Sequence, residues 1–126
     1  MPEAKDHYLK GLELFGQDKY KEAIAEYEQA LELKPQWTDA MHALAMAHMS
    51  AGTLDDAIRI GNEIVELDKE DAFAHTSLSM FYQRKGMIEE AEKEAAKARM
   101  ISWKEELKKN PNAPPPGPAG SMDVIQ

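Results

Sequence analysis

The stretch DKYKEAIAEYEQALELKP, residues 18–35, returns thirty-four residues later as GTLDDAIRIGNEIVELDK, residues 52–69, and again as GMIEEAEKEAAKARMISW, residues 86–103. An acidic residue followed by an alanine stands at the same place in each copy, ending at Ala23, Ala57 and Ala91. A period of this length is typical of arrays in which every unit is a pair of helices. The sequence therefore predicts three similar helical hairpins.

Within the units, apolar residues recur at intervals of three and four, which is the period of an amphipathic helix. Ile24, Tyr27 and Leu31 show this spacing in the first copy. We expect six helices in antiparallel pairs, at about residues 3–16, 19–33, 38–51, 54–67, 72–85 and 88–109. Glycines stand near the ends of the first helices, where a left-handed residue ends a helix at low cost, namely Gly16, Gly52 and Gly86.

A second shared stretch precedes each copy, at residues 8–15, 42–49 and 76–83. With it, residues 4–103 resemble the tetratricopeptide repeat (TPR) family. Small residues carry the resemblance where two helices cross, because only small side chains let helix backbones come that close. These residues are Gly11, Ala45 and Ser79 on the first helices and Ala23, Ala57 and Ala91 on the second.

The resemblance implies an all-α fold, a right-handed α-α superhelix (TPR solenoid) of three helical hairpins. The repeats would span about residues 4–37, 38–71 and 72–105, within a domain of residues 1–110 that includes an extended C-terminal helix. No glycine or proline interrupts residues 88–109, so we favour one continuous helix there. In the alternative, Ser102 and Glu105 form a capping box that starts a separate short helix.

Residues 111–126 hold five of the seven prolines and form a Pro-rich tail, which we expect to be extended or flexible. Either this tail is a plain linker, or it brings its apolar end, residues 122–126, to the groove of its own chain or of a neighbour.

The composition excludes several classes of function. The chain has no cysteine, which removes disulfides and thiolate zinc sites. Of the net charge of −8, −3 falls on residues 1–35 and −5 on residues 36–70, so we expect no nucleic-acid partner and favour a basic one. No apolar run approaches the roughly 20 residues of a membrane span, and the start lacks a signal-peptide pattern. We therefore expect a cytoplasmic protein without a membrane partner.

Catalysis is not expected. The four histidines include no pair four residues apart and no HExxH motif, and the sequence has no glycine-rich phosphate loop and no nucleophile elbow. His48 falls at a position where the two helices of a hairpin touch, so we expect it to be a satisfied packing residue. His42 faces the predicted groove, where we expect a solvated ring. The sequence thus indicates no enzyme, no metal and no cofactor.

The resemblance also implies where a ligand binds. In TPR solenoids the first helices line a concave groove that takes an extended peptide or a partner helix. Transferred position by position, the groove holds Tyr8, Leu12, Phe15, His42, Met46, Met49, Phe73, Thr76, Met80 and Gln83, with Lys5 and Asp39 beside them.

This groove is apolar and rich in methionine, whose flexible side chain adapts to differing apolar ligands. An apolar peptide segment or partner helix is therefore the expected ligand, with Tyr8 and Phe73 as its anchors. In the alternative reading, Met46 and Met80 belong partly to the core and the exposed patch is small.

One family activity depends on particular residue types. Chaperone-docking TPR domains hold the C-terminal carboxylate of their ligand with lysine, arginine and asparagine, in an arrangement called the carboxylate clamp. The corresponding positions of this chain are Tyr8, Leu12, Ala43, Phe73 and Ser77. None of these side chains can hold a carboxylate in that way, so we expect no clamp.

A second hypothesis is a self-associating scaffold. Met100, Trp103 and Leu107 fall on one stripe of the last predicted helix, and this stripe or the tail would join two copies. The protein would then be a weak homodimer rather than a monomer.

Overall fold

The computed structural model describes residues 2–117. Over this range the chain forms α-helices and no strand. The helices are α1 (Ala4–Gly16), α2 (Tyr20–Leu33), α3 (Thr38–Ala51), α4 (Leu54–Leu67), α5 (Ala72–Arg84) and α6 (Ile88–Lys109). Each bound lies within about one residue of the position predicted from the repeat. Because α6 runs without a break to Lys109, the separate helix started by Ser102 is not formed.

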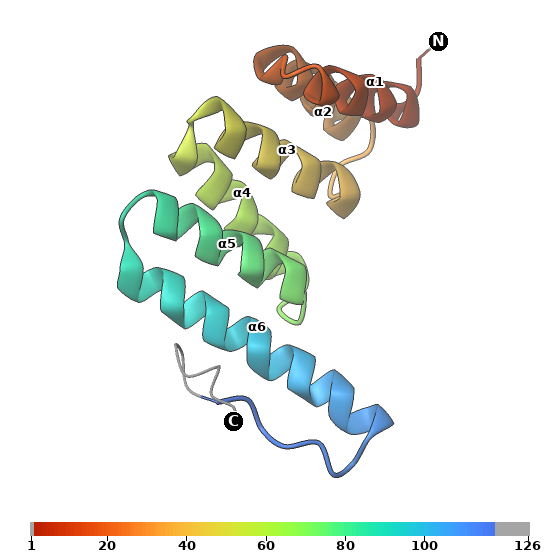
Figure 1. Ribbon diagram of the computed structural model, residues 1–126. Coiled ribbons are helices and arrows are strands. Elements are labelled where there is room, and N and C mark those ends of the chain that lie inside the picture. Colours follow the sequence, from red (N-terminus) through yellow and green to blue (C-terminus); the bar gives the residue numbers. More distant parts are fainter. Residues whose placement is uncertain (1, 118–126) are drawn as a thin grey trace.

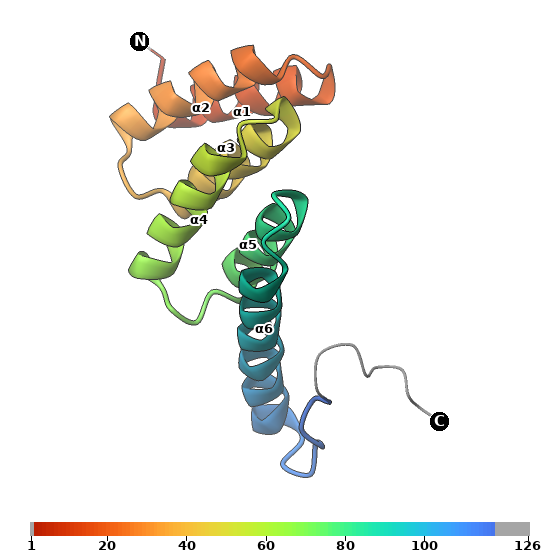
Figure 2. The same cartoon turned by 90° about the vertical axis from the view of Figure 1, so that its left-hand side faces the viewer.

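The helices stack in chain order as three antiparallel hairpins, from α1 and α2 at one end to α5 and α6 at the other (Figure 1). Each helix packs against the helices before and after it in the sequence. The first and third helices, α1 and α3, also touch each other. Turned by 90°, the array is long and open, and the chain after α6 runs back beside that helix (Figure 2). Such a stack is a solenoid, in which every unit depends on its neighbours for its core.

Left-handed residues end the first helices of the second and third hairpins as predicted. Gly52 has a φ of +88° and Gly86 a φ of +85°. The prediction for Gly16 is wrong, because the left-handed residue after α1 is Asp18, with a φ of 62°. Asp18 lies one period before Gly52, and aspartate is among the few residues that tolerate this conformation.

Small residues allow the close helix crossings that the resemblance implied. Ala23 and Ala57 are fully buried. Gly11 lies under the ring of Tyr27, so that a Cβ atom placed on Gly11 would come within 2.6 Å of the tyrosine Cδ1. The prediction of close packing at these positions is therefore confirmed for the first hairpin, where no side chain fits beneath the tyrosine ring.

In two of the hairpins, a histidine of the first helix also contacts a glutamate of the second helix. In the first, His7 Nδ1 lies 2.8 Å from Glu26 Oε1, and in the third, His75 Nδ1 lies 2.6 Å from Glu94 Oε1. The two pairs stand two repeat periods apart in the sequence. The equivalent positions of the middle hairpin hold the buried apolar residues Met41 and Ile60.

Candidate functional site

A hollow of about 290 Å³ lies on the face formed by α1, α3 and α5, the first helices of the three hairpins. It is lined by Tyr8, Asp39, His42, Ala43, Met46 and Phe73. We call this the groove hollow. All but Ala43 were predicted to line or border the groove. The acidic side chain in it is Asp39, and no lysine or arginine of residues 2–117 lines it.

A carboxylate fixes the histidine of this hollow. His42 Nε2 lies 3.0 Å from Oδ2 of Asp71, and Oδ1 of the same residue accepts the backbone N–H of Ala74 at 3.0 Å. Asp71 therefore caps the start of α5 and holds the groove histidine at the same time. The ring of Phe73 lies against His42, with a centroid distance of 4.8 Å. His42 is thus a hydrogen-bonded and mostly covered ring, not the solvated one that we expected.

An aromatic cluster extends the site toward the N-terminal end. The ring centroid of Tyr8 lies 4.8 Å from that of Trp37, and the Lys34 ammonium stands 4.6 Å from the centre of the indole. These three residues, with Lys5 and Leu9, border a second hollow of about 320 Å³. Sequence reasoning missed Trp37, although an aromatic residue directly before a first helix was a visible signal.

The other predicted groove residues lie in different surroundings. Phe73 is the most exposed of the large apolar ones, with 61% of its surface accessible. Met46 and Met80 are half-buried against the core, as the alternative reading proposed, and Met49 is buried in it. The remaining positions are separate from the groove hollow: Leu12 and Gln83 are exposed, Phe15 packs on Tyr20, and Thr76 borders a hollow at the far end of the array.

The positions that correspond to the carboxylate clamp are not arranged to hold a carboxylate. Tyr8, Ala43 and Phe73 border the groove hollow, Leu12 is exposed, and Ser77 is buried. None of these side chains carries a positive charge, and Asp39 would repel a carboxylate placed among them.

His48 is a packing residue with one satisfied nitrogen. Its Nδ1 lies 2.7 Å from the hydroxyl of Thr53, which donates in turn to the His48 carbonyl oxygen at 3.0 Å. Since that hydroxyl uses its proton on the carbonyl, Nδ1 is the donor and Nε2 the acceptor. Nε2 is buried without a hydrogen-bond partner, and burial lowers the pKa of the ring. The expectation of a packing residue is confirmed, and the expectation that its side chain is satisfied holds for Nδ1 but not for Nε2.

The proposed self-association residues fall on two faces of α6. Met100 is exposed and lies at a hollow of about 550 Å³ together with Val65 and Ile101. Trp103 lies at a different hollow, with residues of α5. Leu107 borders neither of these two hollows.

Within residues 2–117, no group of three or more histidine or acidic side chains comes together in a way that could hold a metal ion. Among the helices of this range, none is long and apolar enough to cross a membrane.

A stack of helical hairpins that leaves its first-helix face open defines a class of protein-interaction repeats. The chain belongs to the tetratricopeptide repeat family, whose sequence pattern matches residues 14–78, just over half of its length. The fold and the family predicted from the repeat are thereby confirmed.

Comparison with characterised proteins gives both sequence and structural relatives. The chain is 31% identical over 108 residues to the Hsp70-Hsp90 organizing protein 3 of Arabidopsis thaliana, a match that covers 86% of this chain and 18% of that protein. The crystal structure of MamA superimposes with a TM-score of 0.78 at 27% identity, covering 82% of this chain and 61% of MamA. YrrB, described as a TPR protein with an unusual peptide-binding site, gives a TM-score of 0.77 at 25% identity, over 88% of this chain and 57% of YrrB.

Proposed function

We propose that this chain is a non-catalytic binding module that holds an apolar peptide segment or partner helix against its first-helix face. The observation that carries the proposal is the exposed ring of Phe73 beside the groove hollow. A large apolar side chain left in water beside an apolar concavity is typical of a binding surface. Its neighbours in the hollow, Tyr8 and Met46, would supply further apolar contact to a ligand.

The charge of the hollow favours a ligand with a basic residue. Asp39 is exposed at its edge, and the first two repeats carry most of the negative charge of the chain. An arginine or lysine next to the apolar segment would pair with Asp39 at close range, and the general field would steer such a ligand to the face. For the same reason we propose that a free C-terminal carboxylate is not the recognised group.

The relatives support a protein or peptide as the partner. One is named for organising two other proteins, and another is described by its peptide-binding site. Because the chain matches only 18% of the organizing protein, the partners of that protein are not transferred to this chain. We further propose a cytoplasmic location, on the basis of the sequence pattern alone.

The test is partner capture by the full chain carrying Phe73→Ser. The ring is 61% exposed, so its loss should leave the fold intact, while retention of apolar partners identified by mass spectrometry should fall at least about tenfold, as for a binding hot spot. Leu33→Ser is the matched control, because Leu33 is 55% exposed at the end of α2, outside the groove hollow.

Asp39→Lys is a second variant, which should weaken the capture of ligands with a basic residue and spare neutral ones. Equal capture by the native chain and by Phe73→Ser would place the binding site elsewhere.

Self-association is the second candidate, favoured by the exposed Met100 beside Val65 and Ile101. Sedimentation of the chain over a hundredfold range of concentration distinguishes the two. A rising mass that Met100→Lys abolishes would support a homodimer through this surface, and a constant monomer mass would exclude it.

A further inference from the structure

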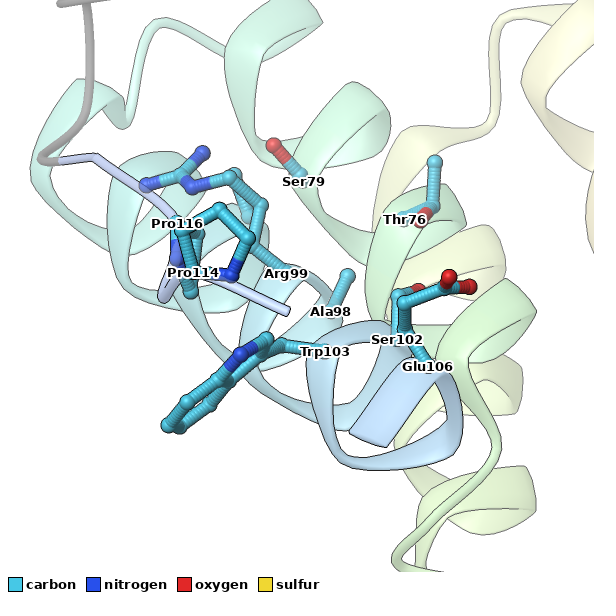
Figure 3. Close-up of a pocket in the computed structure, with 10 residues that line it drawn as sticks. Thr76, Ser79, Ala98, Arg99, Ser102, Trp103, Glu106, Pro114 and Pro116 are labelled. Atoms are coloured by element: carbon cyan, nitrogen blue, oxygen red, sulfur yellow. The ribbon is translucent and has the colours of Figure 1, made fainter. Parts of the chain in front are cut away.

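On one side of the last hairpin, no helix of residues 2–117 covers α5 and α6. In a helical array the next first helix would pack here, against α5 and α6 together. The side contains a hollow of about 610 Å³, bordered by Thr76 and Ser79 of α5 and by Ala98 and Trp103 of α6. We call it the end hollow, and Figure 3 shows these side chains around it.

The chain turns back onto this hollow directly after α6. Asn110 ends the helix, its carbonyl accepts the N–H of Ala113 at 3.0 Å, and its side chain accepts the N–H of Asn112 at 3.2 Å. These bonds reverse the chain within a few residues. The reversal places residues 113–117 beside the C-terminal part of α6 (Figure 2).

The returning segment contacts the end hollow in a specific way. The indole Nε1–H of Trp103 donates to the carbonyl oxygen of Ala113 at 3.1 Å. Pro114 and Pro116 border the hollow and Pro115 does not; Pro116 is half-buried, whereas Pro114 and Pro115 are exposed. Figure 3 shows both bordering prolines close to Arg99 and Trp103.

This pattern matches the way polyproline segments are recognised. A polyproline helix has three residues per turn and no internal hydrogen bonds, so two of every three residues can face a surface while its carbonyls remain free to accept. Protein surfaces that bind such segments are aromatic grooves, because proline rings pack on aromatic side chains with little further loss of entropy. An indole N–H that donates to a carbonyl just before a proline adds direction to this packing.

We infer that the surface of α6 around Trp103, at the edge of the end hollow, is a binding surface for a polyproline segment, and that the segment it holds is the chain's own residues 113–117. The segment contacts Trp103 of α6 and lines the same hollow as Thr76 and Ser79 of α5, on the side where a further helix would pack. This role does not depend on the groove hollow, which lies on a different face and is bordered by other residues.

The test follows the Trp103 indole N–H by nuclear magnetic resonance in the full chain. In the native chain its hydrogen exchange should be slower than that of a free indole. The double variant Pro114→Ala/Pro116→Ala should speed the exchange about two- to tenfold, the range expected for losing one hydrogen bond between neutral groups. Pro115→Ala is the matched control and should change it little, because Pro115 does not border the hollow.

A peptide supplied from outside tests the surface itself. Acetylated and amidated NAPPPGP should shift the Trp103 signal of the double variant at millimolar concentration. It should shift the signal of the native chain less, because the tethered segment competes at an effective concentration in the millimolar range. Trp103→Phe in the double variant should weaken this peptide binding, followed here by the backbone amide signals of α6, since an aromatic ring stays and the donor is lost.

Three results would overturn the inference. The first is native exchange as fast as that of a free indole, and the second is a peptide that leaves the double variant unaffected. The third is protection that falls on dilution of the native chain, which would assign the occupant to a second copy.

Discussion

Replacing one member of the histidine–glutamate pair in the third hairpin should destabilise the protein, and replacing both members should restore most of the lost stability. His75 is 4% exposed and Glu94 is 13% exposed, so the 2.6 Å contact between them lies inside the protein. His75 Nε2 also lies 3.0 Å from the carbonyl oxygen of Lys69. Both ring nitrogens therefore lie within hydrogen-bond distance of oxygen atoms, one from a side chain and one from the backbone.

The substitution Glu94→Ile removes one acceptor and leaves His75 Nδ1 buried without a partner. Losing a hydrogen bond that involves a charged group costs about 1.5–3 kcal/mol, and we expect the free energy of unfolding to fall by that amount. Adding His75→Met removes the stranded nitrogen and recreates the Met41 and Ile60 pair of the middle hairpin. The double variant should then come within about 1 kcal/mol of the native chain, because replacing both members of a buried pair by apolar residues is often neutral.

Urea unfolding, followed by circular dichroism near neutral pH, measures each variant and closes a double-mutant cycle. The first hairpin supplies the control, since His7 and Glu26 are 21% and 30% exposed and make the same contact. Glu26→Ile should cost less than about 1 kcal/mol, as for a solvated pair. The reasoning would be refuted by a loss below about 0.5 kcal/mol for Glu94→Ile, or by a double variant less stable than the single one.

Three further outcomes follow from other contacts. Gly11→Ala should destabilise the fold by about 1–2 kcal/mol in urea unfolding, because the added methyl meets Tyr27, whereas Gly16→Ala, with no atom within 4 Å, should gain up to about 1 kcal/mol. Burial lowers the pKa of His48 from its usual value of 6.5. The contribution of His48 to the free energy of unfolding should therefore be complete above pH 6.5 and be lost as the pH falls below it. His48→Leu should flatten this part of the curve of stability against pH, and an unchanged slope would contradict the buried, neutral state of the ring. Burial raises the pKa of Tyr27 from 10.0 to about 12, so stability should fall as the pH rises above 10, and Tyr27→Phe should reduce that loss in alkaline unfolding curves.

The repeat made most of the fold predictable. Where two or three copies carry the same kind of residue at one position, a helix bound in one copy supports the bound in the others, which is why α3 and α4 were predicted at Thr38–Ala51 and Leu54–Leu67. The same comparison corrects the error at Gly16. Asp18 occupies the same repeat position as Gly52 and Gly86, and all three residues have a positive φ. The repeat period therefore indicated the left-handed conformation of Asp18, although the residue is not a glycine.

The candidate site was predictable in position but not in its bonds. Alignment with the family placed Tyr8, His42 and Phe73 on one face, and the structure brings these residues together around one hollow. The Asp71 that holds His42 lies outside the first helices, so a position-by-position transfer could not find it. The histidine–glutamate pairs could have been found from the sequence, since His7 and His75 occupy the same position of the first and third repeats, and so do Glu26 and Glu94.

The contact between Trp103 and the tail could not be predicted from the repeat, because the tail lies after the last repeat. Composition predicted an extended segment after Asn110, but the direction in which it leaves α6 depends on the turn at Asn110. From the sequence, Trp103 was instead proposed as part of the stripe of α6 that would join two copies of the chain. A periodic stripe shows which residues share a helix face and not which neighbour covers them. The proposed docking of residues 122–126 lies outside the described residues.

The length of α6 limits how further repeat units can be added after the third hairpin. The first helices begin at Ala4, Thr38 and Ala72, and a fourth unit copied at the same spacing would begin at about residue 106. That position lies inside α6, which continues to Lys109. Duplication of a unit therefore cannot lengthen the array at this end unless the helix is first broken near Ser102. By the same reasoning, an engineered fusion of further repeats should replace residues 102–117 rather than follow them.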